Sequence, residues 1–237
     1  MNATGTLYLI PSNLSVPFTP AAILPRDVIA IASRLDYYIA ENAKSARAFL
    51  KSLGIERPMR DLSIVELNAR TGEDALAEML VPLQGGYDVG LVSEAGAPGV
   101  ADPGALIVEL AHRTRIRVMP LVGPSSILLG LMASGLNGQH FAFHGYLPQE
   151  KTARISAIRE LEQESRRRDM TQMFIETPYR NHALIADLIA TLAPATRLCI
   201  ASDLTGPTES IVQQPVAAWR KAAIEAVKAP AMFLILA

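Results

Sequence analysis

Residues 93–104 read SEAGAPGVADPG and follow directly on the apolar run VGLV at 89–92. Such a continuous run suits a strand of a parallel sheet, because helices cover that kind of sheet on both faces. Ligands of open α/β sheets lie beyond the carboxyl ends of the strands, so this segment stands where a binding site is expected. Its glycines allow a ligand to approach the backbone closely, and Pro98 and Pro103 stiffen it. Composition alone leaves two interpretations open: a ligand-binding loop and a tight strand-to-helix connection.

The first half of the chain alternates predicted strands and helices. Short runs rich in Ile, Val and Leu predict strands at 6–10, 36–40, 63–67, 88–92 and 116–120. The segments between them predict helices at 25–35, 42–53, 72–83 and 103–113. Asp102 suits the N-cap of the last of these helices, before Pro103. The alternation predicts an α/β domain with a mostly parallel sheet.

The second half has a different rhythm. Helices are predicted at 124–134, 151–168 and 179–192, and strands at 141–143, 170–176, 196–202, 209–214 and 231–236. Strands that follow one another without a helix between them favour antiparallel pairing, so this half is predicted to be α/β with a mixed sheet. Gly123 and Pro124 mark a turn between the halves. We therefore expect two α/β domains, residues 1–122 and 123–237.

The composition excludes several classes of protein. Half of the 237 residues are apolar and 19% are charged, which indicates a compact soluble protein, and the net charge of -1 argues against a broad basic surface. One cysteine and four histidines offer no disulfide and no spacing typical of a metal site. The sequence shows neither a signal peptide nor an apolar stretch long enough to span a membrane. We expect a cytoplasmic protein without a metal and without a membrane partner.

Two more loops follow predicted strands. GPSS, at 123–126, runs into a helix, so backbone N–H groups and the hydroxyls of Ser125 and Ser126 meet at a helix N-terminus. That loop either binds a ligand or only caps the helix. PSNLS, at 11–15, contains no glycine where a dinucleotide-binding fold would have a glycine-rich turn, and no phosphate-binding GxxxxGK[ST] motif exists in the chain. The common nucleotide-binding motifs are therefore disfavoured.

Seven segments, taken in order, give the chain a family resemblance. They are GTLYLIPSNLS, AENAKSARAFL, SEAGAPGVADPG, PLVGPSSILLGLMASGL, FAFHGYLP, FIETPYR and LCIASDLTGPTES. Their order and spacing resemble the tetrapyrrole-methylase-like superfamily of S-adenosylmethionine-dependent methyltransferases. The closest resemblance is to the bacterial branch that methylates a cytidine ribose of 16S ribosomal RNA.

The resemblance implies a fold, a cofactor and partners. It implies two α/β domains with S-adenosyl-L-methionine in a cleft between them, a homodimer, and ribosomal RNA or the small ribosomal subunit as the partner. By position in the matching motifs, the residues that would line the cofactor are Leu14, Ala97, Val100, Ser125, Ser126 and Thr177.

The chain also departs from the family pattern. Ser12 and Asn13 stand where the first motif usually has a glycine, and ENAK at 41–44 replaces an acidic pair followed by Thr-Arg. Glu94 and Ala97 stand where the ribosomal enzymes usually have Asp and Thr, and VELNAR at 65–70 replaces a histidine-rich stretch. The departures keep two alternatives open. One is a methylase of a small molecule such as a tetrapyrrole precursor, and the other is a non-catalytic S-adenosylmethionine-binding module.

Methyl transfer to a ribose hydroxyl needs alignment of donor and acceptor and is helped by a positioned base. Glu176 and Arg180, four residues apart in FIETPYR, are the predicted catalytic pair, with Glu176 accepting the proton and Arg180 holding a phosphate. The alternative is a structural carboxylate paired with an arginine at a helix start. Glu41, Lys44 and Arg47 are predicted on the substrate side. For these three, the alternatives are a first-turn acidic residue and a solvated helix face.

Overall fold

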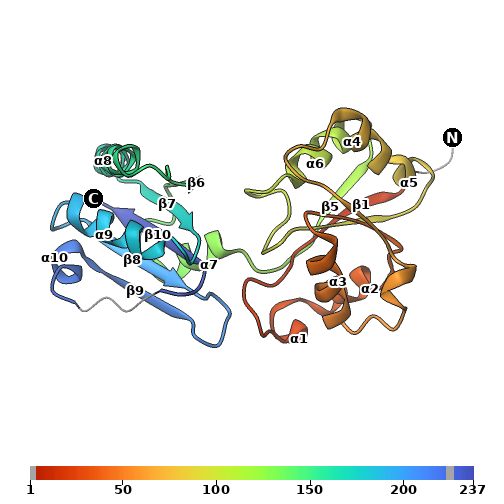
Figure 1. Cartoon of the computed structure of the whole chain (residues 1–237), viewed down its shortest axis with the longest axis horizontal. Coiled ribbons are helices and arrows are strands. Elements are labelled where there is room, and N and C mark those ends of the chain that lie inside the picture. Colours follow the sequence, from red (N-terminus) through yellow and green to blue (C-terminus); the bar gives the residue numbers. More distant parts are fainter. Residues whose placement is uncertain (1–3, 223–226) are drawn as a thin grey trace. The chain divides into compact units, whose positions relative to one another are not determined.

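The computed structural model describes residues 4–222 and 227–237 of the chain. The chain forms two compact units, Met1–Ser125 and Ser126–Ala237, and each contains one five-stranded sheet (Figure 1). No helix among the described residues combines the length and the apolar character that crossing a membrane would require.

The first unit is built on a sheet in which all strands run parallel. The strands are β1 (Thr6–Ile10), β2 (Tyr37–Ala40), β3 (Ser63–Glu66), β4 (Val89–Val92) and β5 (Arg117–Pro120), in the spatial order β3-β2-β4-β1-β5. All four residues of β4 are buried, whereas every residue of the edge strands β3 and β5 is exposed or half-buried. The predicted parallel sheet is confirmed, and each strand lies within a residue of its predicted bounds.

Helices cover both faces of this sheet (Figure 1). They are α1 (Pro20–Ile23), α2 (Arg26–Arg34), α3 (Ala43–Ser52), η1 (Met59–Asp61), α4 (Glu73–Met79), α5 (Val81–Gln84) and α6 (Gly104–Arg113). Residues of α2 and α3 pack in one apolar cluster with Ile10 and Tyr38, and residues of α4 and α6 pack in a second with Leu7 and Ile39. Alternate residues of the same strands therefore serve the two clusters, as expected of a sheet buried on both faces.

Two features of the first unit differ from the prediction. The single helix expected at 72–83 is divided at Leu80, because Pro82 in the first turn of α5 has no N–H to continue the hydrogen-bond pattern of α4. The four-residue helix α1 was not predicted, since so short a segment shows no helical period.

The second unit contains a mixed sheet, as predicted. Its strands are β6 (Phe141–Tyr146), β7 (Thr171–Glu176), β8 (Arg197–Ser202), β9 (Ser210–Pro215) and β10 (Ala231–Leu236), in the order β6-β7-β10-β8-β9. Only β6 and β7 pair in parallel, and the other three pairings are antiparallel. Strand β6 is longer than the predicted 141–143 because the register shifts between Phe143 and Tyr146, where Gly145 has a φ of 65°.

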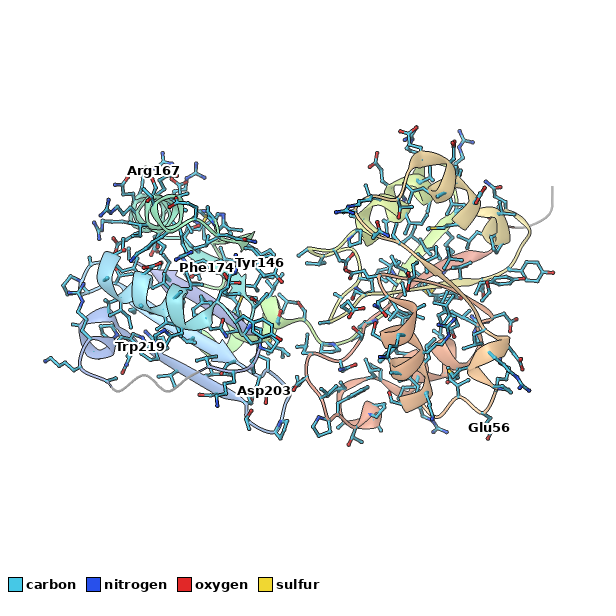
Figure 2. All side chains as sticks on the ribbon, viewed as in Figure 1. Glu56, Tyr146, Arg167, Phe174, Asp203 and Trp219 are labelled. Carbon is cyan, nitrogen blue, oxygen red and sulfur yellow. The ribbon has the colours of Figure 1, made fainter. Side chains whose placement is uncertain are left out.

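The helices of the second unit are α7 (Ser126–Ser134), α8 (Lys151–Arg168), α9 (Asn181–Thr191) and α10 (Val216–Trp219). Helix α8 begins where the Glu150 carboxylate accepts the N–H groups of Thr152 and Ala153 and ends at Asp169, whose φ is 48°. Helices α8 and α9 are joined by a buried ion pair in which Arg154 donates twice to Oδ2 of Asp187, at 2.8 and 2.6 Å. Phe174 of β7, labelled in Figure 2, lies in the core. Its ring stacks on that of Phe233 of β10.

Candidate active site

Three loops of the first unit meet at one edge of its sheet. Strands β4, β1 and β5 are neighbours and run parallel, so the segments that follow them leave the sheet at the same edge. The segment after β1 is hydrogen-bonded to the segment after β4, since the backbone N–H of Ser12 donates to the carbonyl of Gly96 at 2.9 Å. The loops predicted to bind the cofactor are therefore in contact within one unit.

Two glycines make this contact possible. Gly96 has a φ of 74°, and a Cβ placed there would lie 3.1 Å from Cδ2 of Leu14 and 3.5 Å from the carbonyl oxygen of Pro124. A Cβ on Gly123 would lie 2.6 Å from Cγ of Pro11, inside van der Waals contact. The structure thus brings together the predicted Leu14, the loop that carries Ala97, and the loop that carries Ser125.

Asp102 holds the 93–104 loop closed. Its carboxylate accepts the N–H of Gly99 at 2.9 Å and the N–H of Gly104 at 2.7 Å, so it ties the loop to the start of α6. Asp102 was predicted as the N-cap, but Pro103 occupies that position and Asp102 lies one residue earlier. Burial raises the pKa of Asp102, and the backbone N–H groups oppose that rise. Val100, predicted to contact the cofactor, is 49% exposed within the loop.

The predicted Glu41 stands at the same edge, after β2. Its Oε1 accepts the backbone N–H of Glu94 at 3.2 Å, and Oε1 of Glu94 accepts the hydroxyl of Ser45 at 2.5 Å. Burial raises the pKa of Glu41; the N–H of Glu94 lowers it, and the negative charges of Asp102 and Glu94 raise it further. Sequence reasoning did not place Glu94 and Ser45 beside Glu41. Only the neighbouring positions of β2 and β4 in the sheet bring them there.

The predicted substrate residues Lys44 and Arg47 lie on α3, which follows Glu41. The helix is capped by Asn42, whose side-chain oxygen accepts the N–H groups of Lys44 and Ser45 at 2.9 and 3.1 Å. Both cationic side chains are exposed, and Nη1 of Arg47 donates to the carbonyl of Ala43 at 3.3 Å.

The predicted catalytic pair lies in the second unit and is an ion pair. Oε1 of Glu176, at the end of β7, accepts Nε and Nη2 of Arg180 at 2.9 and 2.8 Å and the backbone N–H of Thr177 at 2.7 Å. The Glu176 side chain is 2% exposed and that of Arg180 is 28% exposed. Among the described residues, no donor reaches Oε2 of Glu176 and no acceptor reaches Nη1 of Arg180. Of the predicted cofactor residues, Thr177 and Ser126 also belong to this unit.

Known proteins resemble the chain over nearly its whole length. A ribosomal RNA small subunit methyltransferase I of Xylella fastidiosa is 33% identical over 92% of this chain and 75% of its own length. One from Escherichia coli O157:H7 is 29% identical over 93% of this chain and 73% of its own length. The chain belongs to the ribosomal RNA small subunit methyltransferase I family. No family model matches it.

Solved structures of other proteins share the fold of this chain. Diphthine synthase superposes with a TM-score of 0.68 at 16% identity, over 98% of this chain and 89% of that one. Uroporphyrin-III-C-methyltransferase of Thermus thermophilus superposes with a TM-score of 0.56 at 17% identity, over 98% and 92%. The predicted tetrapyrrole-methylase-like fold with two α/β units is confirmed. As a member of this family, the chain is a methyltransferase. Residues 4–222 and 227–237 contain no cluster of side chains that suits a metal ion.

Proposed function

We propose that this chain uses S-adenosyl-L-methionine to methylate the 2'-hydroxyl of a cytidine ribose in 16S ribosomal RNA, within the small ribosomal subunit. The observation that carries the cofactor site is the meeting of Leu14, Gly96 and Pro124 from three loops at the carboxyl edge of the first sheet. The acceptor rests on the family, whose curated members are named for the small-subunit RNA. The homodimer is proposed on the family resemblance alone, and the cytoplasmic location agrees with relatives that are named for ribosomal RNA.

The residues present fit this cofactor in shape and in charge. Gly96 and Gly123 let the three loops approach closely, because a Cβ at either position would press on a neighbouring loop, so a ligand at this edge can contact the backbone of all three. Within the described parts of the chain, Glu41, Glu94 and Asp102 have no salt-bridge partner, so their charges favour a positively charged ligand at this edge. When bound, S-adenosylmethionine supplies a methyl group on a positively charged sulfur. The residues proposed to hold it are Leu14, Ala97, Val100, Ser125, Ser126 and Thr177.

Two carboxylates are proposed as the acceptor of the ribose proton. Glu176 offers the oxygen that Arg180 does not bind, and its position is fixed by that ion pair. Glu41 offers a carboxylate whose raised pKa makes it a better base near neutral pH. Arg180 on the second unit, and Lys44 and Arg47 on the first, are proposed to bind phosphates of the RNA.

Calorimetry and a methyl-transfer assay test the proposal. Ala97→Trp should abolish binding of S-adenosylmethionine because the indole fills the space between the loops. Ala77→Trp is the control, since Ala77 is exposed on α4 of the same unit. Wild type should transfer labelled methyl groups to small ribosomal subunits and not to porphyrin precursors. Absence of micromolar cofactor binding by wild type would refute the cofactor, and label on the porphyrins alone would refute the acceptor.

A further inference from the structure

Two exposed tyrosines lie at one edge of the second sheet. Strands β6 and β7 are parallel neighbours, so both end at the same edge, and Tyr146 closes β6 opposite Ile175 of β7. Tyr179 follows the end of β7 by three residues. Tyr146 is 55% exposed and Tyr179 is 96% exposed. Figure 2 shows Tyr146 at the margin of the unit, in contrast to the buried Phe174.

The backbone that carries each tyrosine is fixed, although each ring is free of the core. The N–H groups of Arg180 and Asn181 donate to the carbonyl of Thr177 at 3.0 and 3.2 Å, which folds residues 177–181 into a turn. Tyr146 follows the bulge at Gly145, and bulges redirect the side chains beside them. The large aromatic residues of the core, such as Phe233 and Trp219, are buried and partnered. Exposure of these tyrosines is therefore not a consequence of a loosely packed unit.

A partly exposed cation, Arg180, follows Tyr179 directly in the sequence. Nε and Nη2 of Arg180 bind Glu176, while Nη1 is buried and meets no acceptor in the described chain. The pairing with Glu176 fixes the guanidinium while the Arg180 side chain remains 28% exposed, so its exposed part can receive a phosphate with little further ordering. Lys151, with a side chain that is 73% exposed, follows Tyr146 by five residues. Exposed aromatic rings combined with cations are the recurring features of surfaces that bind single-stranded nucleic acid.

We propose that Tyr146 and Tyr179 stack on unpaired bases of the acceptor RNA, while Arg180 binds the adjoining phosphate. This proposal rests on the proposed function, because it identifies residues of the chain that bind the RNA substrate. An aromatic ring can stack on any base. The two tyrosines are therefore expected to increase the affinity for an unpaired strand without making binding specific for its sequence.

Methyl-transfer kinetics with small ribosomal subunits test the pair. Tyr179→Ala and Tyr146→Ala should each raise KM about tenfold, with a smaller change in kcat, because each removes one stacked base. Tyr179→Phe should behave as wild type, since the ring stacks and the hydroxyl does not. Tyr87→Ala is the control; Tyr87 is also 55% exposed, but it lies in the first unit. A KM for both alanine variants within about twofold of an active wild type would overturn the inference.

A fluorescence measurement separates this inference from the proposed function. The chain has one tryptophan, the buried Trp219, so Tyr179→Trp adds an exposed indole. A short unstructured oligoribonucleotide should quench that emission and leave Tyr87→Trp unaffected. Quenching by the oligoribonucleotide with no methyl transfer to ribosomal subunits would refute the proposed function and preserve the stacking surface. Absence of quenching would refute the stacking surface whatever the enzyme methylates. A change of oligomeric state in Tyr146→Ala or Tyr179→Ala, with KM unchanged, would show instead that the tyrosines bind protein.

Discussion

Two carboxylates of the first unit, Glu41 and Asp102, and two of the second, Glu176 and Asp187, are bound in opposite ways. In the first unit, Glu41 and Asp102 accept backbone N–H groups, and burial raises the pKa of both. In the second unit, Glu176 at the end of β7 and Asp187 of α9 are each bound by an arginine. A carboxylate that lacks a cationic partner keeps its charge available to a ligand. A carboxylate paired with an arginine stabilises its own surroundings instead.

The two units also differ in what holds their segments together. In the first unit, close backbone contacts at Gly96 and Gly123 shape the site, so little depends on the chemistry of individual side chains. In the second unit, charged side chains join the helices to one another and to the sheet. Deleting a side chain should therefore harm the second unit most, whereas adding volume should harm the first unit most.

The largest expected effect is the loss of a charge partner in the second unit. Asp187→Ala leaves Arg154, whose side chain is 10% exposed, without its carboxylate. The free energy of unfolding should fall by about 3–5 kcal/mol, because an uncompensated buried charge remains. Urea denaturation with circular dichroism measures this change.

Lys151→Ala is the matched control for Asp187→Ala. Lys151 is 4.0 Å from the same carboxylate, but its side chain is 73% exposed, so its removal should cost less than about 1 kcal/mol. Equal losses in the two variants would show that burial does not decide the strength of these pairs, and the contrast between the units would then fail.

The next effect concerns volume added to the first unit. Gly123→Ala places a Cβ against the ring of Pro11 and should cost about 1–3 kcal/mol as the two loops separate. The same displacement should weaken binding of S-adenosylmethionine by about tenfold, as measured by calorimetry. Gly72→Ala is the control, because a Cβ there meets nothing within 4 Å and the φ of -74° suits alanine. Unchanged cofactor affinity in Gly123→Ala would show that the cofactor site does not depend on the contact between Gly123 and Pro11.

Local patterns predicted most of the fold. Continuous apolar runs marked the strands because β4 and β10 are buried along their whole lengths. Two of the errors arose where one residue overrides the pattern. Pro82 interrupts a helix that has the right period, and Gly145 lets β6 continue past an apparent stop. The effect of such residues depends on whether the surrounding structure can accommodate them.

The candidate site was less predictable than the fold. The motifs identified the three loops, but the bond between Ser12 and Gly96 depends on the strand order β4-β1-β5, which no local pattern contains. The sequence also paired Glu176 with Arg180 by their spacing alone. The exposure of Tyr179 in the same motif could not be read from it, because exposure depends on packing between elements that are distant in the sequence.

The smallest effect tests the unpaired carboxylates directly. Because the pKa of Glu41 is raised above its ordinary value of 4.5, the folded state binds the proton more tightly than the unfolded state. The stability that this proton contributes is fully present below the ordinary pKa and is lost as the pH rises through the folded pKa. Glu41→Gln cannot lose a proton, and its amide oxygen still accepts the N–H of Glu94. At pH 7 the variant should therefore unfold at a higher temperature than wild type, by about 2 °C at most, and the difference should disappear in acid.

Glu56→Gln, at an exposed position of the same unit (Figure 2), should show no such difference at either pH. A Glu41→Gln variant that is less stable than wild type at pH 7 would mean that a cation balances the charge of Glu41, and the contrast between the two units would not extend to this residue.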